Sequence, residues 1–323
     1  MSRVAAIDCG TNSIRLLIAD ASADGAAGPL RDIVREMRVV RLGQGVDATG
    51  ELAPEALERT FAAAREYAGL IKVHGAGRVR FVATSATRDA RNRQVFVDGI
   101  RDLLGVEPEV ITGDEEAALS FAGAGSVLPA MGEDPILVVD LGGGSTEFVL
   151  GDSTGVIAAR SVDIGCVRLT ERHLRSDPPT AAQIAAAEAD VDAALDLAMQ
   201  AVPLDRATAV VGVAGSITTV TAHALGLDKY RPERIHGASL SLETISDACT
   251  NLLEMTRDER AALPYMHPGR VDVIGAGALV WRRILERLSS VCSGSVGNSR
   301  IEAAVASEHD ILDGIALSIR DAG

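Results

Sequence analysis

Two segments of the chain follow the same plan, and this repeat restricts the possible folds more than any other feature of the sequence. Residues 4–18 read as a short apolar strand, a turn rich in Asp, Gly, Asn and Ser, and a second apolar strand. Residues 136–150 repeat that order. The matched positions are Asp8 with Asp140, Gly10 with Gly142, and Ser13 with Ser145. We interpret the chain as two halves related by an internal duplication, each built around a β-hairpin with a polar tip.

Helix and strand patterns alternate after each hairpin. Apolar spacing predicts helices over 54–70, 92–104, from 115 onward, and over 181–201, 216–225 and 241–255. Strands are predicted over 79–83, 109–112, 155–163 and 209–213. Mixed strands and helices around two similar halves indicate an α/β protein, and we expect the active site in a cleft between two domains.

The predicted domain boundary lies in the loop 128–135, which holds two prolines. The expected domains are therefore 1–128 and 129–323, with a C-terminal helix over about 308–323 that packs back on the first domain. The small, polar stretch 289–299 predicts a surface loop.

Charge restricts the partners of the chain. Its 31 Lys and Arg residues stand against 45 Asp and Glu residues, a net charge of −14. This balance opposes nonspecific attraction to nucleic acid or to an acidic membrane surface, so we expect neither as a partner. The longest stretch without an acidic or basic residue, 207–227, contains glycines, four threonines and His223. It predicts a strand, a turn and a helix rather than a membrane span.

The four cysteines lie far apart without a CxxC pair, which supports neither a zinc ribbon nor a dense disulfide framework. We expect buried free thiols in a reducing compartment. The apolar run that begins at Val4 ends at Asp8, before a secretory apolar region of about 7–15 residues is complete. These features favour a cytoplasmic location.

Glycine-rich turns at the hairpin tips are candidates for binding phosphate. Residues 140–147 read Asp-Leu-Gly-Gly-Gly-Ser-Thr-Glu. The backbone amides of Gly142, Gly143 and Gly144 can approach a phosphate closely, Ser145 adds a hydroxyl donor, and Asp140 offers a carboxylate to a divalent ion. Glycines also simply form hairpins, so this turn alone is weak support. Its counterpart with Asn12 and Ser13 in the first hairpin strengthens the phosphate interpretation.

A third turn, 211–219, follows a strand and opens a helix whose first amides, at Gly215 and Ser216, can bind an anion. The alternative is a strand-to-helix turn that needs glycine for a positive φ.

Carboxylates and arginines complete the candidate site. Asp114, Glu115 and Glu116 open a predicted helix, where acidic residues also meet the helix dipole favourably. The functional alternative is that one glutamate acts as the general base for a water nucleophile. Six arginines and two aspartates between residues 78 and 101 make this segment locally basic, and Arg88 follows a strand where a ligand-facing loop is expected.

Several common hydrolase motifs are absent from the sequence. The six histidines show no HExxH spacing, which does not support a zinc hydrolase. No GxxxxGK[ST] loop and no GxSxG elbow is present, which excludes P-loop nucleotide hydrolysis and the usual serine-hydrolase arrangement.

The ordered set of motifs resembles the exopolyphosphatase and guanosine pentaphosphate phosphohydrolase (Ppx/GppA) family, within the superfamily of acetate and sugar kinases, heat-shock chaperones and actin. The resemblance covers nearly the whole chain. Its motifs are Ala6-Ile-Asp-Cys-Gly-Thr-Asn-Ser13, Arg41-Leu-Gly-Gln-Gly45, Thr84-Ser-Ala-Thr-Arg-Asp-Ala90, Gly113-Asp-Glu-Glu-Ala117, the stretches 140–147, 163–168, 212–216 and 270–277, and Ser307-Glu-His-Asp-Ile-Leu-Asp-Gly314.

The resemblance implies two actin-like (ribonuclease H-like) domains and Mg²⁺-dependent removal of the terminal phosphate from inorganic polyphosphate, with Mn²⁺ as a possible substitute. It assigns the catalytic base to Glu116, the metal-binding and catalytic carboxylates to Asp140 and Glu147, and a phosphate contact to Arg88. It also implies a homodimer. The chain ends without the C-terminal HD-type region of longer members, so we expect a preference for short polyphosphate chains.

Three other functions stay open on the sequence. The nearest is hydrolysis of guanosine pentaphosphate, the alarmone of the stringent response, by the same residues with a nucleoside in the cleft. A kinase of the same superfamily would need a pocket for an acceptor hydroxyl. A non-enzymatic phosphate sensor would use the glycine turns without Glu116.

Overall fold

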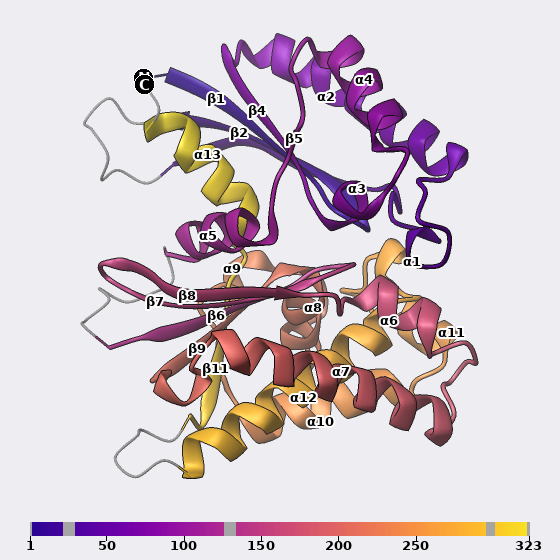
Figure 1. Ribbon diagram of the computed structural model, residues 1–323, viewed down its shortest axis with the longest axis vertical. Coiled ribbons are helices and arrows are strands. Elements are labelled where there is room, and N and C mark those ends of the chain that lie inside the picture. The colour runs from indigo at the N-terminus through magenta and orange to yellow at the C-terminus, as the bar shows by residue number, and fades with distance from the viewer. Residues whose placement is uncertain (1, 22–29, 126–133, 295–300, 322–323) are drawn as a thin grey trace. The chain divides into compact units, whose positions relative to one another are not determined.

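The computed structural model of the protein describes residues 2–21, 30–125, 134–294 and 301–321. The chain forms two compact units (Figure 1). Unit 1 comprises residues 1–123 and 311–323, and unit 2 comprises residues 124–310. The predicted boundary at 128/129 lies outside the described residues. The predicted cleft between the two domains stays a prediction, because each unit is described by itself.

The sheet of unit 1 contains five strands in the order β3-β2-β1-β4-β5. β1 pairs antiparallel with β2 and β2 with β3, whereas β1, β4 and β5 run parallel. The strands are β1 (Ser2–Cys9), β2 (Ser13–Ala21), β3 (Arg31–Val39), β4 (Arg78–Ala83) and β5 (Glu109–Val110).

Strict alternation in β1 explains why helices cover both faces of this sheet. Ala5 and Ile7 pack in one apolar cluster with side chains of α2 and α4, whereas Val4 and Ala6 pack with side chains of α5 and α13. Figure 1 shows α2 and α4 along one face and α13 along the other. The helices of this unit are α1 (Val46–Thr49), α2 (Pro54–His74), α3 (Ser85–Asp89), α4 (Arg93–Leu104), α5 (Gly113–Ala124) and α13 (Ile311–Asp321).

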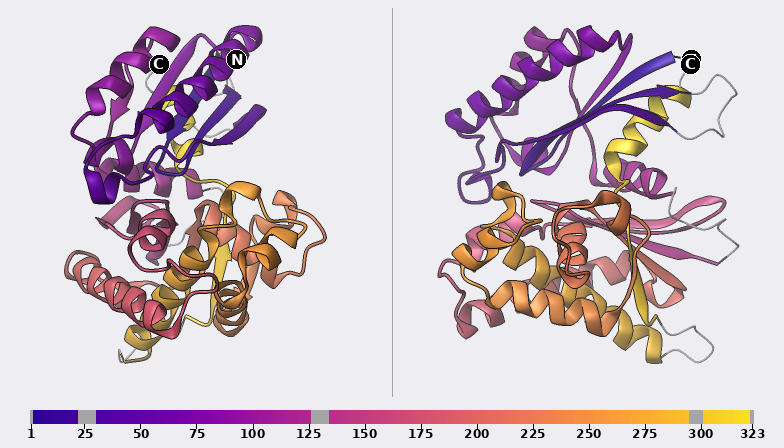
Figure 2. Two further views of the ribbon diagram at one scale, coloured as in Figure 1. Left: turned by 90° about the vertical axis from the view of Figure 1, so that its right-hand side faces the viewer. Right: turned by 180° about the vertical axis from the view of Figure 1, so that it is seen from behind.

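Unit 2 is built on a six-stranded sheet in the order β10-β11-β9-β6-β7-β8. Its strands are β6 (Ile136–Leu141), β7 (Thr146–Asp152), β8 (Gly155–Val162), β9 (Ala209–Val213), β10 (Ser239–Ser241) and β11 (Ala303–Ala306). Its helices are α6 (Cys166–Arg172), α7 (Ala181–Ala201), α8 (Ala214–Ala224), α9 (Pro232–Ile235), α10 (Leu242–Glu254), α11 (Arg257–Ala262) and α12 (Ile274–Gly294). Figures 1 and 2 show α7, α10 and α12 gathered on one face of the sheet.

The predicted duplication is confirmed by the topology of the two sheets. The order β3-β2-β1-β4-β5 in unit 1 matches β8-β7-β6-β9-β11 in unit 2. The hairpin tips also share one backbone hydrogen bond. The amide of Gly10 donates to the carbonyl of Ser13 at 3.0 Å, and the amide of Gly142 donates to that of Ser145 at 3.0 Å. The expectation of an α/β protein with two similar halves is therefore confirmed.

Several elements differ from the sequence predictions, and two of the differences are informative. The edge strand β3 went unpredicted, because its exposed, charged residues lack an apolar alternation. The predicted loop 289–299 is wrong for residues 289–294, which continue α12. Cys292 is buried there and its thiol donates to the carbonyl of Leu204, so this helical turn packs on the core. Residues 295–299 lie outside the described part of the chain.

All four cysteines are buried free thiols, as predicted. Burial raises the pKa of the Cys9 thiol well above its usual value, which keeps it protonated and unreactive. Each helix that the structure describes is too short or too polar to cross a membrane.

We expect Gly314→Ala to lower the free energy of unfolding by about 1–3 kcal/mol, the usual cost of overpacking a core. A Cβ at Gly314 in α13 would lie 1.9 Å from the carbonyl oxygen of Leu119 in α5, so one helix must move. Urea denaturation measures the change. Gly69→Ala in α2 is the control, since no atom lies within 4 Å of its added Cβ. Equal stability of Gly314→Ala and wild type would contradict this packing.

Candidate phosphate and metal site

The first residues of α6 donate hydrogen bonds to the carbonyls of the β6–β7 tip. The carbonyl of Gly142 accepts from the amide of Cys166 at 3.1 Å, and that of Gly143 accepts from the amides of Val167 and Arg168 at 2.9 and 3.1 Å. The Arg168 guanidinium donates through Nε to the carbonyl of Gly144 at 2.7 Å. The carbonyls of the turn are thus bound on the α6 side.

The amides of Gly143, Gly144 and Ser145 differ from these carbonyls in their hydrogen bonding. Within the described residues, no protein acceptor is recorded for these three N–H groups. Ser145 is 3 % exposed and Gly144 is also buried, so the three donors are held in a fixed frame. Successive backbone amides whose carbonyls are engaged elsewhere form a concave site for an anion. The geometry is compatible with the predicted phosphate-binding role of Gly143, Gly144 and Ser145, which stays a prediction. The amide of Gly142, also predicted to bind phosphate, instead donates to the carbonyl of Ser145 within the turn.

Two carboxylates lie directly opposite each other beside this tip. Asp140 on β6 pairs in register with Glu147 on β7. Opposite residues of an antiparallel pair point to the same face, with Cβ atoms about 4.5–5.5 Å apart. Asp140 is 6 % exposed and Glu147 is 1 % exposed. Like charges directly opposite are unfavourable unless a cation or a proton lies between them.

The donor set of this pair fits magnesium better than zinc. Mg²⁺ is usually held by one or two carboxylates together with water and substrate phosphate oxygens. No cluster of three or more His, Cys, Asp or Glu side chains suited to a metal occurs in the ranges that the structure describes. Asp140 and Glu147 therefore match a site whose remaining ligands come from phosphate and water.

Glu147 also accepts a hydrogen bond from the neighbouring strand β8, which the sequence analysis did not predict. Ser161 on β8 pairs in register with Glu147, and its hydroxyl donates to Glu147 Oε1 at 2.7 Å. Only the pairing register of β7 and β8 identifies this residue, because its local sequence contains no motif.

The equivalent row of unit 1 has diverged. Asp8 lies opposite Arg15, which binds it through Nε at 2.9 Å and Nη2 at 2.7 Å. The carboxylate that matches Asp140 in the duplication is thus neutralised within its own unit. Of the two repeats, only unit 2 places two carboxylates opposite each other.

The β1–β2 tip carries the predicted phosphate residues Asn12 and Ser13. The carbonyl of Asn12 accepts from the amides of Val40 and Arg41 at 3.1 and 2.8 Å, which fixes the tip. The side-chain oxygen Oδ1 of Asn12 is buried, and it has no hydrogen-bond partner in the described part of the chain. Such a group is costly unless a ligand or water satisfies it. The carbonyl of Ser13 is used by the turn itself.

Burial distinguishes the three carboxylates at the start of α5. Glu116 is 7 % exposed, whereas Asp114 and Glu115 are exposed. Glu115 pairs with Arg80 at 2.8 Å. Glu116 Oε2 instead accepts from Nη1 of Arg88 at 3.0 Å. Glu116 is therefore the buried, oriented carboxylate of the three, as a general base requires.

Arg88 retains donors beyond this ion pair. Its two hydrogen bonds in the described structure, to Glu116 and to the carbonyl of Ile111, both use Nη1. A guanidinium has five N–H donors, so Nε and Nη2 remain for phosphate oxygens. The predicted phosphate contact is compatible with this geometry and stays a prediction.

The third turn differs from its sequence interpretation. The turn has the positive φ that the alternative interpretation requires, 71°, but at Ala214 and not at a glycine. Gly215 instead provides space, because a Cβ there would lie 2.5 Å from Nη2 of Arg270. Ser216 is 6 % exposed and lies against Cys166, whose thiol pKa is raised by burial. The structure places Ser216 in the packing of α8.

Arg270 therefore joins the candidate site as a residue to which the sequence analysis assigned no role. Its guanidinium donates to Thr219 Oγ1 at 3.0 Å and lies over the ring of Tyr230, 5.9 Å from the centroid. It adds positive charge at the N-terminal end of α8, where an anion is already favoured. Arg270 opens the sequence motif 270–277, but its place beside this turn could not be predicted, because the two segments lie far apart along the chain.

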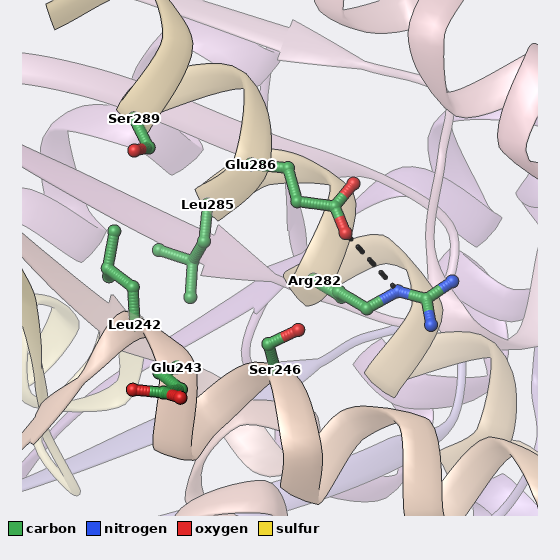
Figure 3. A pocket seen from close by; sticks show the side chains of 7 residues that line it. All are labelled: Leu242, Glu243, Ser246, Arg282, Leu285, Glu286 and Ser289. Carbon is green, nitrogen blue, oxygen red and sulfur yellow. Dashed lines mark ion pairs between the residues drawn. The ribbon is translucent and has the colours of Figure 1, made fainter. Parts of the chain in front are cut away.

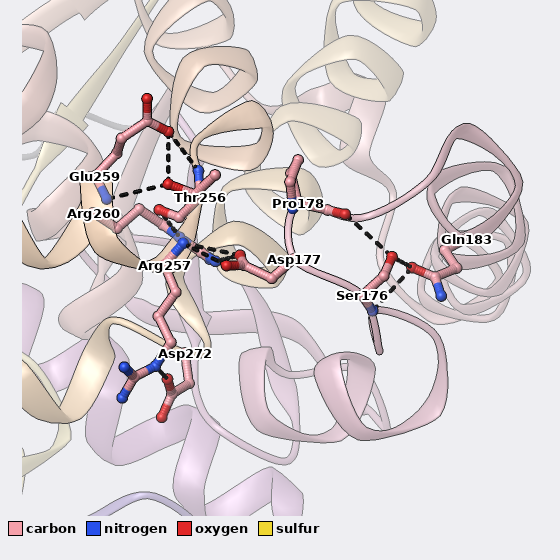
Figure 4. A network of polar contacts seen from close by, with 9 residues as sticks. All are labelled: Ser176, Asp177, Pro178, Gln183, Thr256, Arg257, Glu259, Arg260 and Asp272. Atoms are coloured by element: carbon pink, nitrogen blue, oxygen red, sulfur yellow. Dashed lines mark hydrogen bonds and ion pairs between the residues drawn. The ribbon is translucent and has the colours of Figure 1, made fainter.

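A polar network braces the segment that carries Arg270 (Figure 4). Both carboxylate oxygens of Asp177 accept from the backbone amide of Arg257 at 2.9 Å. Asp177 also pairs with the buried Arg260 at 2.9 Å. Arg257 in turn binds Asp272, two residues beyond Arg270, at 2.6 Å. The network ties three separate stretches of unit 2 together.

A cavity of about 350 Å³ lies between α10 and α12 (Figure 3). Leu242 and Leu285 form its apolar lining, and Arg282 pairs with Glu286 across 3.6 Å at its edge. None of the predicted site residues lines this cavity, so it has no part in the phosphate site.

We expect Gly165→Ala to disturb the phosphate turn. An added Cβ would lie 2.5 Å from the carbonyl carbon and oxygen of Gly143 and 2.6 Å from the amide of Gly144. Binding of inorganic phosphate, measured by calorimetry, should weaken at least about tenfold, since one hydrogen bond to a charged group contributes about 1.5–3 kcal/mol. Gly77→Ala, with no atom within 4 Å of its Cβ, should bind as wild type does. Unchanged binding in folded Gly165→Ala would rule out this turn as the anion site.

Comparison with known proteins identifies the family of the chain. Residues 18–315 match the Ppx/GppA phosphatase family. The chain is 52 % identical over 324 residues to exopolyphosphatase 2 of Mycobacterium tuberculosis, with 99 % of each chain covered. It is 35 % identical over 198 residues to a guanosine-5'-triphosphate,3'-diphosphate pyrophosphatase of Photobacterium profundum, which covers 61 % of this chain and 37 % of that protein.

A solved structure shows the same fold. The crystal structure of an exopolyphosphatase-like protein superimposes with a TM-score of 0.92 at 51 % identity, covering 98 % of this chain and 97 % of the other. The family resemblance and the actin-like fold predicted from the motifs are thereby confirmed. The chain belongs to the Ppx/GppA phosphatase family.

Proposed function

We propose that the protein is an exopolyphosphatase that hydrolyses the terminal phosphoanhydride bond of inorganic polyphosphate. The observation that carries this proposal is the buried carboxylate pair of Asp140 and Glu147 beside the amides of residues 143–145. This arrangement suits a chain of phosphates accompanied by a divalent ion. The 52 % identity to a protein named exopolyphosphatase 2 supports the same substrate class.

The terminal phosphate is bound by the amides of Gly143, Gly144 and Ser145, and by Asn12 and Ser13. Arg88 contributes its remaining guanidinium donors to the phosphate oxygens. These groups neutralise charge that spreads over the equatorial oxygens in a loose phosphoryl transition state. Gly215 and Ser216 contribute to anion binding through the N-terminal end of α8, to which Arg270 adds positive charge.

Asp140 and Glu147 would hold Mg²⁺, with Mn²⁺ as a substitute. When bound, the ion supplies charge neutralisation at the phosphate oxygens and orients the substrate. The two carboxylates are already buried and in register, so little side-chain entropy is lost on binding.

Glu116 orients and deprotonates the attacking water. Its carboxylate is buried, and the hydrogen bond from Arg88 to Oε2 holds it in a fixed orientation, as a general base requires. The proton moves to this carboxylate as the oxygen of the water attacks the terminal phosphorus in line with the leaving phosphate chain.

The alternative substrate is guanosine pentaphosphate, cleaved at its 5' end by the same residues. The relative from Photobacterium profundum, whose name describes this activity, supports it over part of the chain. Competition separates the two substrates, because a nucleoside pocket makes the alarmone a substrate or a tight inhibitor of polyphosphate hydrolysis. Phosphate release to water without an acceptor excludes a kinase, and loss of activity in Glu116→Gln excludes a passive sensor.

Finer properties belong to the same proposal. A preference for short polyphosphate chains, expected from the family resemblance, is one of them. The homodimer and the cytoplasmic location expected from the sequence stay predictions.

We expect Glu116→Gln to lower kcat for phosphate release from polyphosphate by about 10²–10⁴-fold, the usual contribution of a general base. KM should change little, because the amide keeps the size of the side chain and the phosphate contacts lie elsewhere. Phosphate release with Mg²⁺ is the measurement.

Glu115→Gln is the matched control for this experiment. It removes the adjacent carboxylate, which is exposed and paired with Arg80, and should retain wild-type kcat. A folded Glu116→Gln variant with unchanged kcat would exclude Glu116 as the base.

A further inference from the structure

Three adjacent strands of unit 2 place Asp140, Glu147 and Ser161 in one row. Asp140 on β6 lies opposite Glu147 on β7, and Glu147 lies opposite Ser161 on β8. Directly opposite residues point to one face, so all three side chains emerge on the same side of the sheet. The face is set by packing, since the alternate residues Phe148 and Val162 belong to the apolar core cluster on the other side.

Strand register alone does not fix the orientation of the Glu147 carboxylate. Like charges directly opposite repel, and a glutamate has three rotatable bonds through which its carboxylate can turn away. The Ser161 hydroxyl donates to Oε1 at 2.7 Å and opposes that rotation. Ser161 is only partly buried, whereas the Glu147 side chain that it binds is 1 % exposed. A carboxylate has about four acceptor sites, so one that accepts a hydrogen bond can also ligate a cation.

The other half of the chain provides an internal comparison. The same row in unit 1 reads Asp8, Arg15 and Met37. Arg15 neutralises Asp8 directly, and the third position is a thioether with no hydroxyl to donate. The hydroxyl thus occurs in the row with two carboxylates and is replaced in the row with an ion pair.

We propose that Ser161 is a positioning residue that holds Glu147 in the geometry in which it binds a divalent cation together with Asp140. This inference rests on the proposed function for the role of the cation. Hydrogen bonds to ligating carboxylates generally contribute about 10–100-fold to metal affinity.

Ser161→Thr and Ser161→Val form the decisive pair of variants, because their side chains have nearly the same shape and both suit a strand. Titration of the full chain with Mn²⁺ without substrate, followed by the electron paramagnetic resonance of the free ion, measures affinity independently of activity. We expect Ser161→Val to bind Mn²⁺ about 10–100-fold more weakly than wild type and Ser161→Thr to bind within about twofold. Asp140→Asn, which removes a ligand, is the reference for a lost site. Circular dichroism confirms that each variant is folded.

Two results would overturn the positioning role. Equal Mn²⁺ affinity of Ser161→Val and Ser161→Thr contradicts it, and so does a wild type that binds no Mn²⁺ at millimolar concentration. The proposed function fails separately, if wild type releases no phosphate from polyphosphate. The affinity difference between the two variants then still decides the role of Ser161.

Discussion

The pairing register of β6 with β7 is the constraint on which the candidate site depends. Leu137 and Val139 on β6 and Phe148 on β7 pack into the apolar core of unit 2, which fixes the face that each strand presents to the helices. Asp140 and Glu147 then necessarily emerge together on the opposite face. A slip of one residue would exchange the two faces, burying carboxylates in the core and exposing the apolar residues. The hydrophobic effect therefore holds two carboxylates together that would otherwise repel each other.

Duplication followed by divergence explains how one fold carries two different hairpin tips. Both units retain the sheet order and the turn hydrogen bond between a glycine amide and a serine carbonyl. The row of unit 1 holds the Asp8–Arg15 ion pair, and that of unit 2 holds two carboxylates. The charge of the second repeat can be balanced by a bound cation, whereas that of the first is balanced within the protein. The repeats thus share a backbone and differ in chemistry.

Local patterns predicted much of this structure, because strands, turns and helices leave signals within a few residues. The hairpins, most of the longer helices and the duplication could all be predicted from the sequence, and the turn glycines indicated the candidate anion site. The roles of Ser161 and Arg270 could not be predicted, because that of Ser161 depends on strand register and that of Arg270 on a contact between distant segments. The position of the positive φ could not be predicted either, because alanine, unlike glycine, disfavours the conformation that Ala214 adopts.

The central claim is that water attacks the terminal phosphorus of a polyphosphate chain. Hydrolysis of a polyphosphate of defined length in water enriched in oxygen-18, analysed by mass spectrometry of both products, tests it directly. The account predicts one oxygen-18 atom in each released phosphate and none in the shortened chain. Label in the shortened chain, with none in the released phosphate, would place the attack on the penultimate phosphorus and contradict the account.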